Sequence, residues 1–414
     1  MARSVIVLGA GMVGVSVALH LRRRGFEVVL LDRQGPGEGA SFGNGGLIQR
    51  EAVLPHPFPR GFGEIRRIAA NRSIDVSFHP LALPGFASPL LQYWWHSEPT
   101  RYRHAVEAHA ALIETCLDEH LAFARGTPAM ALLRPIGWMR LYSSPALLDS
   151  ALALAEAARR EHDVNFVALD GPGLAAAEPH LLVARAGAIH WTDPLSVSDP
   201  HALTLAYAGM FTAEGGRFVL GDATTLARAG AGWRVQSEAG PVEAEQVVVA
   251  LGAHAVEVTR RLGYAPPLFG KRGYHMHYRA QGNAVLNRPV LDTESGFLLA
   301  PMRAGIRLTT GAEFARTDAP PTPVQLERAE PVARTLFPLA ERVEGAPWMG
   351  VRPCMPDMLP VIGPMPGQQG AWCAFGHAHQ GLTLGPTTGR LLADMMAGDA
   401  PFLNPEPYRP DRFR

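Results

Sequence analysis

A glycine pattern near the start of the chain constrains the fold more than any other feature of the sequence. Residues 5–14 read VIVLGAGMVG, in which Gly9, Gly11 and Gly14 form a GxGxxG pattern. The first glycine of such a pattern permits a tight turn, the second lets the backbone approach a pyrophosphate, and the third lets a helix pack against a strand. The first turn of that helix, with Met12 and Val13, would present free N–H groups to the phosphates.

The residues around this pattern support the same interpretation. We expect a strand over residues 4–8, a helix over 12–24 and a second strand over 27–32, which together form one βαβ unit. The second strand ends at Asp32, whose carboxylate can accept hydrogen bonds from ribose hydroxyl groups. Asp32 disfavours a 2′-phosphate on the ribose and Arg33 beside it favours one, so the pattern predicts a dinucleotide and leaves NAD and FAD open.

Composition excludes several classes of protein. The chain has 414 residues, enough for two domains, and 38 basic residues balance 38 acidic ones, which argues against a nucleic-acid partner. The three cysteines form no CxxC pair, so neither a structural zinc site nor a disulfide framework is expected, and a reducing, cytoplasmic location fits. We see no apolar window long enough to span a bilayer and no convincing metal-ligand set.

The order of the expected elements predicts two discontinuous domains. Strands and helices typical of nucleotide binding stand at the start, the middle and the end of the chain, and alternating segments typical of antiparallel strands lie between them. The expected fold is therefore α/β combined with α+β. We assign residues 1–64, 145–265 and 346–414 to a cofactor-binding domain, and residues 65–144 and 266–345 to a substrate-binding domain with an antiparallel sheet.

Four further segments carry a family resemblance that spans nearly the whole chain. They read ASFGNGG at 40–46, GVRP at 350–353, PDMLPVIG at 356–363 and GHAHQGLTL at 376–384. In this order they resemble the D-amino-acid dehydrogenase and glycine/sarcosine oxidase group of FAD enzymes. The resemblance implies a Rossmann-type FAD-binding domain and non-covalent FAD. It also implies oxidation of an amino acid's C–N bond by hydride transfer to flavin N5, giving an imine that water converts to a 2-oxo acid and ammonia.

The resemblance also assigns cofactor contacts. Ser41 and the turn Asn44, Gly45 and Gly46 match a loop beside the pyrophosphate and the isoalloxazine, where glycine lets backbone N–H groups approach a flat ring. Gly252 matches a turn that closes the cofactor domain, and Thr224 matches a backbone contact with adenine. A segment and helix N-terminus that face the flavin pyrimidine are matched by Gly376, Gly381, Leu382 and Thr383.

On the substrate side, Arg352 matches an arginine that binds the substrate carboxylate, where a planar guanidinium can pair in a bidentate manner. Tyr274 matches a position that can line the pocket. His377 and His379 lie next to the expected flavin segment, where a histidine could adjust the local field or touch substrate. Each of these four residues could instead be structural, an alternative that the flanking motif makes weaker for Arg352, and Lys271 and Arg272 beside Tyr274 could be only solvated charges.

Several alternatives remain open at this point. The substrate could be D-proline or D-hydroxyproline, or glycine or sarcosine, and the residues of 47–59 differ from the stretch typical of broad D-amino-acid oxidation. The electron acceptor could be a quinone, a carrier protein or O2. A flavin-binding module without turnover is a more remote alternative. Trp94, Trp95 and Phe86 also have alternative roles. They could pack the interior of a cap domain, line an entrance, or make a peripheral contact with the inner face of a membrane.

Overall fold

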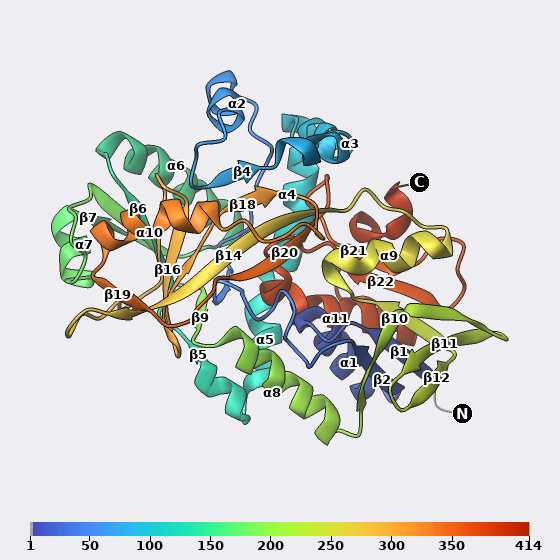
Figure 1. The fold of residues 1–414 in the computed structure, drawn as a ribbon. Helices are drawn as coiled ribbons and strands as arrows, with labels where there is room; N and C mark the ends of the chain where they lie inside the picture. The colour runs from blue at the N-terminus through green and yellow to red at the C-terminus, as the bar shows by residue number, and fades with distance from the viewer. Residues whose placement is uncertain (1–2, 414) are drawn as a thin grey trace.

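The structure, a computed structural model, describes residues 3–413 and contains two large sheets that lie side by side (Figure 1). The first has eight strands in the order β12 (Gly240–Ala244), β11 (Gly232–Ser237), β10 (Arg217–Ala229), β2 (Glu27–Asp32), β1 (Ser4–Leu8), β13 (Gln246–Val249), β22 (Ala371–Phe375) and β21 (Val361–Pro364). The five strands from β10 to β22 are parallel. Their carboxyl ends therefore meet at one edge of the sheet.

The second sheet has eleven strands. Nine lie in the order β4 (Val76–Phe78), β18 (Ala312–Phe314), β14 (Phe269–Ala280), β17 (Gly305–Thr309), β16 (Phe297–Met302), β15 (Val290–Asp292), β6 (Trp138–Tyr142), β8 (Gly187–Trp191) and β7 (Phe166–Asp170), while β19 (Leu339–Arg342) and β20 (Trp348–Cys354) also pair with β14. Most of its pairs are antiparallel. A parallel sheet beside a mainly antiparallel one confirms the predicted combination of α/β and α+β parts.

A small third sheet and the helices connect these layers. The small sheet has the order β3 (Leu47–Ile48), β9 (Leu195–Val197) and β5 (Leu133–Arg134). The helices are α1 (Met12–Arg23), α2 (Phe62–Ala69), α3 (Leu83–His96), α4 (Pro99–Glu114), α5 (Cys116–Ala124), α6 (Pro145–His162), α7 (Gly171–Ala177), α8 (Pro200–Ala213), α9 (Ala255–Thr259), α10 (Val324–Leu336) and α11 (Gly381–Ala397). The predicted unit β1–α1–β2 is confirmed.

Helix α11 packs closely on α1, beneath the parallel sheet (Figure 1). Glycines make the approach feasible, because a Cβ at Gly389 would lie 2.7 Å from the backbone oxygen of Ser16. The helix begins at Gly381 and contains Pro386, a residue that normally ends a helix. Pro386 has no N–H to give to the carbonyl of Leu382, and that carbonyl accepts a hydrogen bond from His120 Nε2 at 2.8 Å instead.

The chain crosses between the two sheets more often than the predicted domain ranges assume. Strands β7 and β8, within 145–265, join the eleven-stranded sheet, and so does β20, within 346–414. Helices α4 and α5, within 65–144, pack against α11 on the other side. The division into cofactor and substrate domains stays a prediction, and we propose that its boundaries follow the sheets. Residues 1, 2 and 414 of the predicted ranges lie outside the described part.

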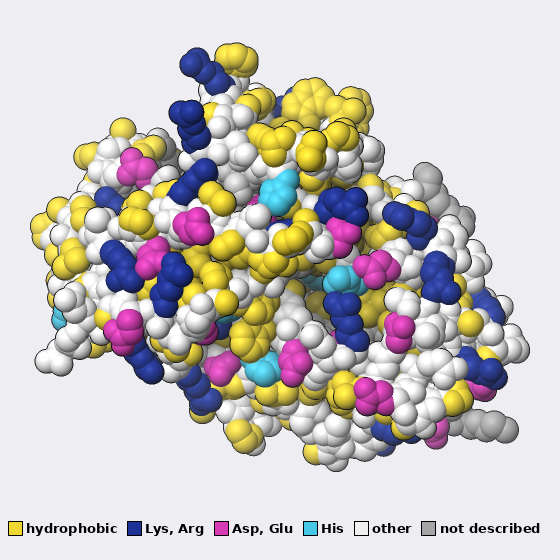
Figure 2. Space-filling view, in the orientation of Figure 1, with side chains coloured by type: hydrophobic (Ala, Val, Ile, Leu, Met, Phe, Trp, Pro, Cys, Tyr) yellow, Lys and Arg dark blue, Asp and Glu magenta, His cyan; other side chains and the backbone are white. Residues whose placement is uncertain are grey.

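A surface at the top of the molecule in Figure 2 gathers hydrophobic side chains over α2 and α3, with cationic ones beside them. Leu81 is 98% exposed and Phe62 81%, and Leu91 and Trp95 are also exposed. The guanidinium of Arg101 lies 3.7 Å from the ring centroid of Trp95. Phe86, by contrast, is buried against Phe314, so it belongs to the cap interior.

Candidate active site

The glycine turn has the shape that a dinucleotide needs. Gly9 adopts a φ of 104°, and a Cβ there would lie 2.5 Å from the carbonyl oxygen of Ala250 at the end of β13. A Cβ at Gly14 would lie 1.8 Å from the carbonyl oxygen of Gly9. Both positions therefore exclude any side chain, and the turn brings its backbone to the carboxyl edge of the sheet.

The N-terminus of α1 is open to an anion. Gly11 is its N-cap and supplies no side-chain hydrogen bond to the helix. Ser41, from the following loop, accepts a hydrogen bond from the Met12 N–H at 2.9 Å, so its hydroxyl lies where a pyrophosphate would meet the helix. The remaining N–H groups and the positive end of the helix dipole fit the pyrophosphate of FAD.

The residues predicted for the adenosine half gather at the same edge. Asp32 Oδ2 accepts a hydrogen bond from the Ala10 N–H at 2.6 Å, so this carboxylate also holds the glycine turn. Arg33 lies 3.2 Å from His254, just after Gly252, which has a φ of 55°. Both backbone groups of Thr224 already have protein partners, Asp222 and Arg261, so a contact with adenine would use the second lone pair of its carbonyl.

The loop predicted to meet the flavin is clamped by the second sheet. The Asn44 side chain accepts a hydrogen bond from the Gly46 N–H at 2.9 Å, and Gly46 has a φ of 72°. Arg307 on β17 donates to the carbonyl oxygens of Phe42 at 3.1 Å and Asn44 at 2.5 Å. Burial lowers the pKa of Arg307 to about 10. Sequence reasoning missed Arg307, although a lone arginine within an apolar strand was a usable signal.

The first turn of α11 lies beside the first turn of α1. A Cβ at Gly381 would lie 4.0 Å from Val13. Thr383 Oγ1 lies 3.3 Å from both the Gln49 N–H and the Leu47 carbonyl oxygen, which ties the helix to β3. Gly376 has a φ of 86° and turns the chain from β22 toward this helix, whose second residue is Leu382. The two helix N-termini thus lie together, next to the strand that follows the loop of Asn44 and Gly45, and their contact with flavin stays a prediction.

Arg352 lies on β20 directly opposite Lys271 on β14. Its Nη1 donates to the Gly311 carbonyl at 2.6 Å and its Nη2 to the Thr310 carbonyl at 3.0 Å. Within residues 3–413 no carboxylate contributes to its electrostatic surroundings, and burial lowers its pKa, with the nearby Cys354 thiol acting in the opposite direction. Arg352 is enclosed by protein yet keeps accessible surface, so its remaining N–H groups face an internal space. A carboxylate entering that space would satisfy them.

Tyr274 does not join Arg352. Alternation along β14 places Lys271 and Gly273 on the face of Arg352, and Arg272 and Tyr274 on the opposite face. There the Tyr274 hydroxyl lies 2.7 Å from Glu313, 2.7 Å from Arg272 and 2.9 Å from the Thr322 N–H. A phenol with three partners in the core has no capacity left for substrate. Arg272 is itself fully buried and paired with Glu313, and is not a solvated charge.

The two histidines of the GHAHQG segment have different surroundings. His377 is buried, and its Nε2 lies 2.9 Å from Thr388 Oγ1 on α11, so it fastens the segment to the helix. His379 lies 5.1 Å from the ring of His56 and 3.0 Å from Gln380 Nε2. Burial lowers the pKa of His379 well below its usual value, and that of His56 to about 4, so both stay neutral at pH 7. The Arg352 guanidinium also acts to lower the pKa of His379, so this histidine, unlike His377, lies near Arg352.

Glu51 is a buried carboxyl group that the sequence indicated only as a difference from related enzymes. It accepts hydrogen bonds from Trp138 Nε1 at 2.9 Å and Gln49 Nε2 at 3.0 Å. Gln49 in turn lies 3.3 Å from Gln380, the neighbour of His379. Burial raises the pKa of Glu51 to about 7. This chain of hydrogen bonds connects a titratable group to the candidate site.

We therefore expect Glu51 to make stability depend on pH. Its pKa is higher in the folded chain, about 7 against 4.5, so its contribution is complete below pH 4.5 and is lost as pH rises through 7. As pH rises across that window, the unfolding free energy of the wild type should fall relative to that of Glu51→Gln by up to about 3 kcal/mol. Denaturant titrations at pH 5 and pH 8 measure it, and parallel pH profiles of the two proteins would contradict it.

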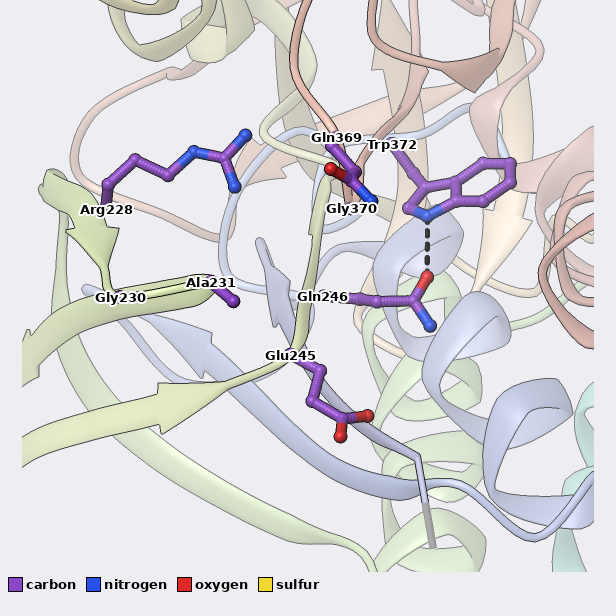
Figure 3. Close-up of a pocket in the computed structure, with 8 residues that line it drawn as sticks. All are labelled: Arg228, Gly230, Ala231, Glu245, Gln246, Gln369, Gly370 and Trp372. Carbon is purple, nitrogen blue, oxygen red and sulfur yellow. Dashed lines mark hydrogen bonds between the residues drawn. The ribbon is translucent and has the colours of Figure 1, made fainter.

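A surface pocket lies away from this candidate site. It holds about 510 Å³ and is lined by Arg228, Gly230, Ala231, Glu245, Gln246, Gln369, Gly370 and Trp372 (Figure 3). Gln246 and Gly370 stand at the start of β13 and just before β22, so the pocket opens at the amino ends of the parallel strands. Dinucleotides bind at the opposite, carboxyl ends. This pocket is therefore not the cofactor site.

Neither a metal site nor a membrane-crossing helix is found in the described part of the chain. Among residues 3–413, no group of three His, Cys, Asp or Glu side chains is arranged to hold a metal ion. Within the same residues, every helix is too short or too polar to cross a membrane.

Comparison with known proteins agrees with this geometry. Residues 4–395 match the family DAO, described as FAD dependent oxidoreductase. A D-amino-acid oxidase of Bradyrhizobium diazoefficiens is 28% identical, with 99% of each chain covered. A D-amino acid dehydrogenase of Cereibacter sphaeroides is 30% identical, with 96% of this chain and 92% of that one covered.

The fold is shared with solved structures as well. The crystal structure of glycine oxidase from Geobacillus kaustophilus superposes with a TM-score of 0.72 at 22% identity, covering 99% of this chain and 98% of that one. Both the family match and this likeness span almost the whole chain. The chain therefore belongs to the DAO family of FAD-dependent oxidoreductases.

Proposed function

We propose that this enzyme oxidises the C–N bond of a small D-amino acid to an imine, which water converts to a 2-oxo acid and ammonia. The observation that carries the proposal is the Arg352 guanidinium, which faces an internal space without a carboxylate partner. Relatives named D-amino-acid oxidase and D-amino acid dehydrogenase support the same substrate class. Bound FAD would supply the hydride acceptor.

The chain's own residues would then bind and orient the substrate. Arg352 is held in place by the carbonyls of Thr310 and Gly311, so it would fix the carboxylate in one direction without reorganising. Neutral His379 and His56 add no charge beside it. Phe86 and Tyr93 of α3 belong to a buried apolar cluster with Cys354, which would keep water out of the space.

We propose that FAD is bound without a covalent link. The three cysteines are buried and free, and burial raises the pKa of Cys354, which disfavours the thiolate. Trichloroacetic acid precipitation should release all of the flavin into the supernatant. Yellow colour that stays with the precipitated protein would contradict this.

Product analysis tests the substrate class. We expect the purified enzyme, supplied with an artificial electron acceptor, to form a 2-oxo acid and an equal amount of ammonia from D-amino acids and not from their L-enantiomers. Oxidation of glycine or sarcosine alone would favour the oxidase alternative, and oxidation of D-proline alone would favour the cyclic substrate. Formation of peroxide during turnover would identify O2 as an acceptor, whereas its absence would leave a quinone or carrier protein.

We also propose that the apolar surface of α2 and α3 makes a peripheral membrane contact. Exposed aromatic and aliphatic side chains with adjacent arginines suit the interface of an anionic bilayer. The wild type should sediment with phosphatidylglycerol vesicles, and the double variant Phe62→Ser, Leu81→Ser should bind at least about tenfold more weakly. Equal sedimentation of the two proteins would rule out this surface.

A further inference from the structure

Lys271 is the only lysine among the 414 residues, in a chain that otherwise uses arginine for every fixed positive charge. It does not lie on the outer surface. Its ammonium group lies 4.7 Å from the ring centroid of Tyr93, 5.5 Å from that of Phe269 and 5.7 Å from that of Phe314. Like Arg352, Lys271 is enclosed by protein yet keeps accessible surface, and its pairing with Arg352 across β14 and β20 puts the two cations side by side at the candidate site.

Neighbouring Arg272 shows how the chain treats a buried cation that is purely structural. Arg272 Nε lies 2.7 Å from Glu313, and its other nitrogens reach backbone carbonyls. Lys271, one residue earlier and on the opposite face of β14, has no carboxylate partner within residues 3–413. Burying a cation without an anion costs free energy of folding, so we would expect a lysine with a purely structural role to be paired with a carboxylate.

The space therefore holds two positive charges that no carboxylate balances. Lys271 and Arg352 are directly opposite each other, and no carboxylate contributes to the surroundings of either. Burial raises the pKa of the nearby Cys354 thiol, which disfavours its thiolate, and His56 and His379 are neutral. The substrate's α-carboxylate would balance only one of them. Their head groups also diverge, because the Arg352 guanidinium lies over Gly273 whereas the Lys271 ammonium lies near Phe269, two residues in the other direction along β14.

We propose that Lys271 binds a second acidic group on the substrate, so that the preferred substrates are dicarboxylic amino acids such as D-glutamate and D-aspartate. This inference rests on the proposed function, in which Arg352 takes the α-carboxylate. The aromatic rings around Lys271 hold the ammonium without neutralising it, and leave its charge available to the side-chain carboxylate. Lys271 is thus a specificity-determining residue.

Anaerobic stopped-flow reduction of the holoenzyme tests the proposal with isosteric pairs. The second-order rate constant of flavin reduction should be roughly 30-fold or more higher for D-glutamate than for D-glutamine, and likewise for D-aspartate over D-asparagine. Lys271→Met keeps length and apolar packing but removes the charge, and should bring each pair to within about threefold by slowing only the acids. Arg316→Met, a change at an exposed arginine paired only with Asp318, is the matched control.

A labelling experiment avoids dependence on the variant's folding. Because the chain has one lysine, trinitrobenzenesulfonate should label Lys271 and the N-terminal amine alone, as peptide mass spectrometry can show. Glutarate, a dicarboxylate without an amine, should slow labelling of Lys271 about tenfold, and pentanoate should not. Equal effects of glutarate and pentanoate would overturn the proposal.

The outcomes separate this inference from the function on which it rests. Reduction of the flavin by D-glutamine as fast as by D-glutamate, or an equal loss for both in Lys271→Met, overturns the second acidic group and leaves D-amino-acid oxidation intact. Unchanged anaerobic reduction of the flavin by D-glutamate in Lys271→Met would also overturn the second acidic group. Reduction by no amino acid at all overturns the proposed function and this inference together.

Discussion

Replacing Arg352 by methionine should lower kcat/KM for the amino-acid substrate by roughly 100- to 1000-fold, while FAD remains bound. The Arg352 guanidinium on β20 places a positive charge at the internal space, and it has no carboxylate partner within the described residues. Losing one partner of a buried, charge-assisted pair costs about 3–4 kcal/mol, which is the stated factor in kcat/KM. Steady-state kinetics with the visible flavin spectrum as a loading check measures both parts.

Two variants make this result interpretable. Arg352→Lys keeps the charge but loses the planar fork, so it should retain part of the activity that Arg352→Met loses. Arg316→Met removes an exposed arginine and should leave kcat/KM unchanged. If Arg352→Met retained wild-type kcat/KM with full flavin, the arginine would not be the carboxylate-binding residue.

Replacing Gly14 by alanine should strongly weaken FAD binding. The new Cβ would lie 1.8 Å from the carbonyl oxygen of Gly9, and a backbone atom cannot move aside as a flexible side chain can. The turn must therefore open, which removes the N–H groups of α1 from the pyrophosphate. We expect FAD to bind at least about a hundredfold more weakly, a loss of roughly 3 kcal/mol, by fluorescence titration of the apoprotein.

The matched control is Gly39→Ala, because a Cβ at Gly39 meets no atom within 4 Å. That variant should bind FAD as the wild type does. Far-ultraviolet circular dichroism distinguishes a lost cofactor site from a lost fold. Normal FAD affinity in Gly14→Ala would mean that the turn adopts another geometry.

The residues of the nucleotide-binding unit could be predicted from the sequence because they lie close together along the chain. Gly9, Gly14 and Asp32 act within one βαβ unit, so their spacing along the chain already encodes their spacing in space. The start of α11 was not readable, because Pro386 normally ends a helix. The hydrogen bond from His120, 262 residues away, makes the helix continuous. A partner so distant in sequence leaves no local pattern.

Predicting the substrate-binding residues requires knowing which face of β14 each side chain occupies. A strand alternates its side chains, but the sequence does not say which of the two faces meets the cofactor. Tyr274 and Lys271 lie on opposite faces, and only the pairing of β14 with β20 places Lys271, rather than Tyr274, with Arg352. Arg307 was missed as a site residue, and Glu51 was indicated only as a difference from related enzymes, for a related reason, since their partners lie in distant segments.

Anaerobic bleaching of the bound flavin tests the account most directly. The purified enzyme, free of oxygen, would be mixed with D- and L-amino acids, D-proline, glycine and sarcosine while the flavin absorbance near its visible maximum is followed. The account predicts rapid bleaching by D-amino acids and none by their L-enantiomers. A protein that holds FAD but is bleached by no amino acid would contradict the assigned substrate class, and a protein that takes up no FAD would contradict the entire site.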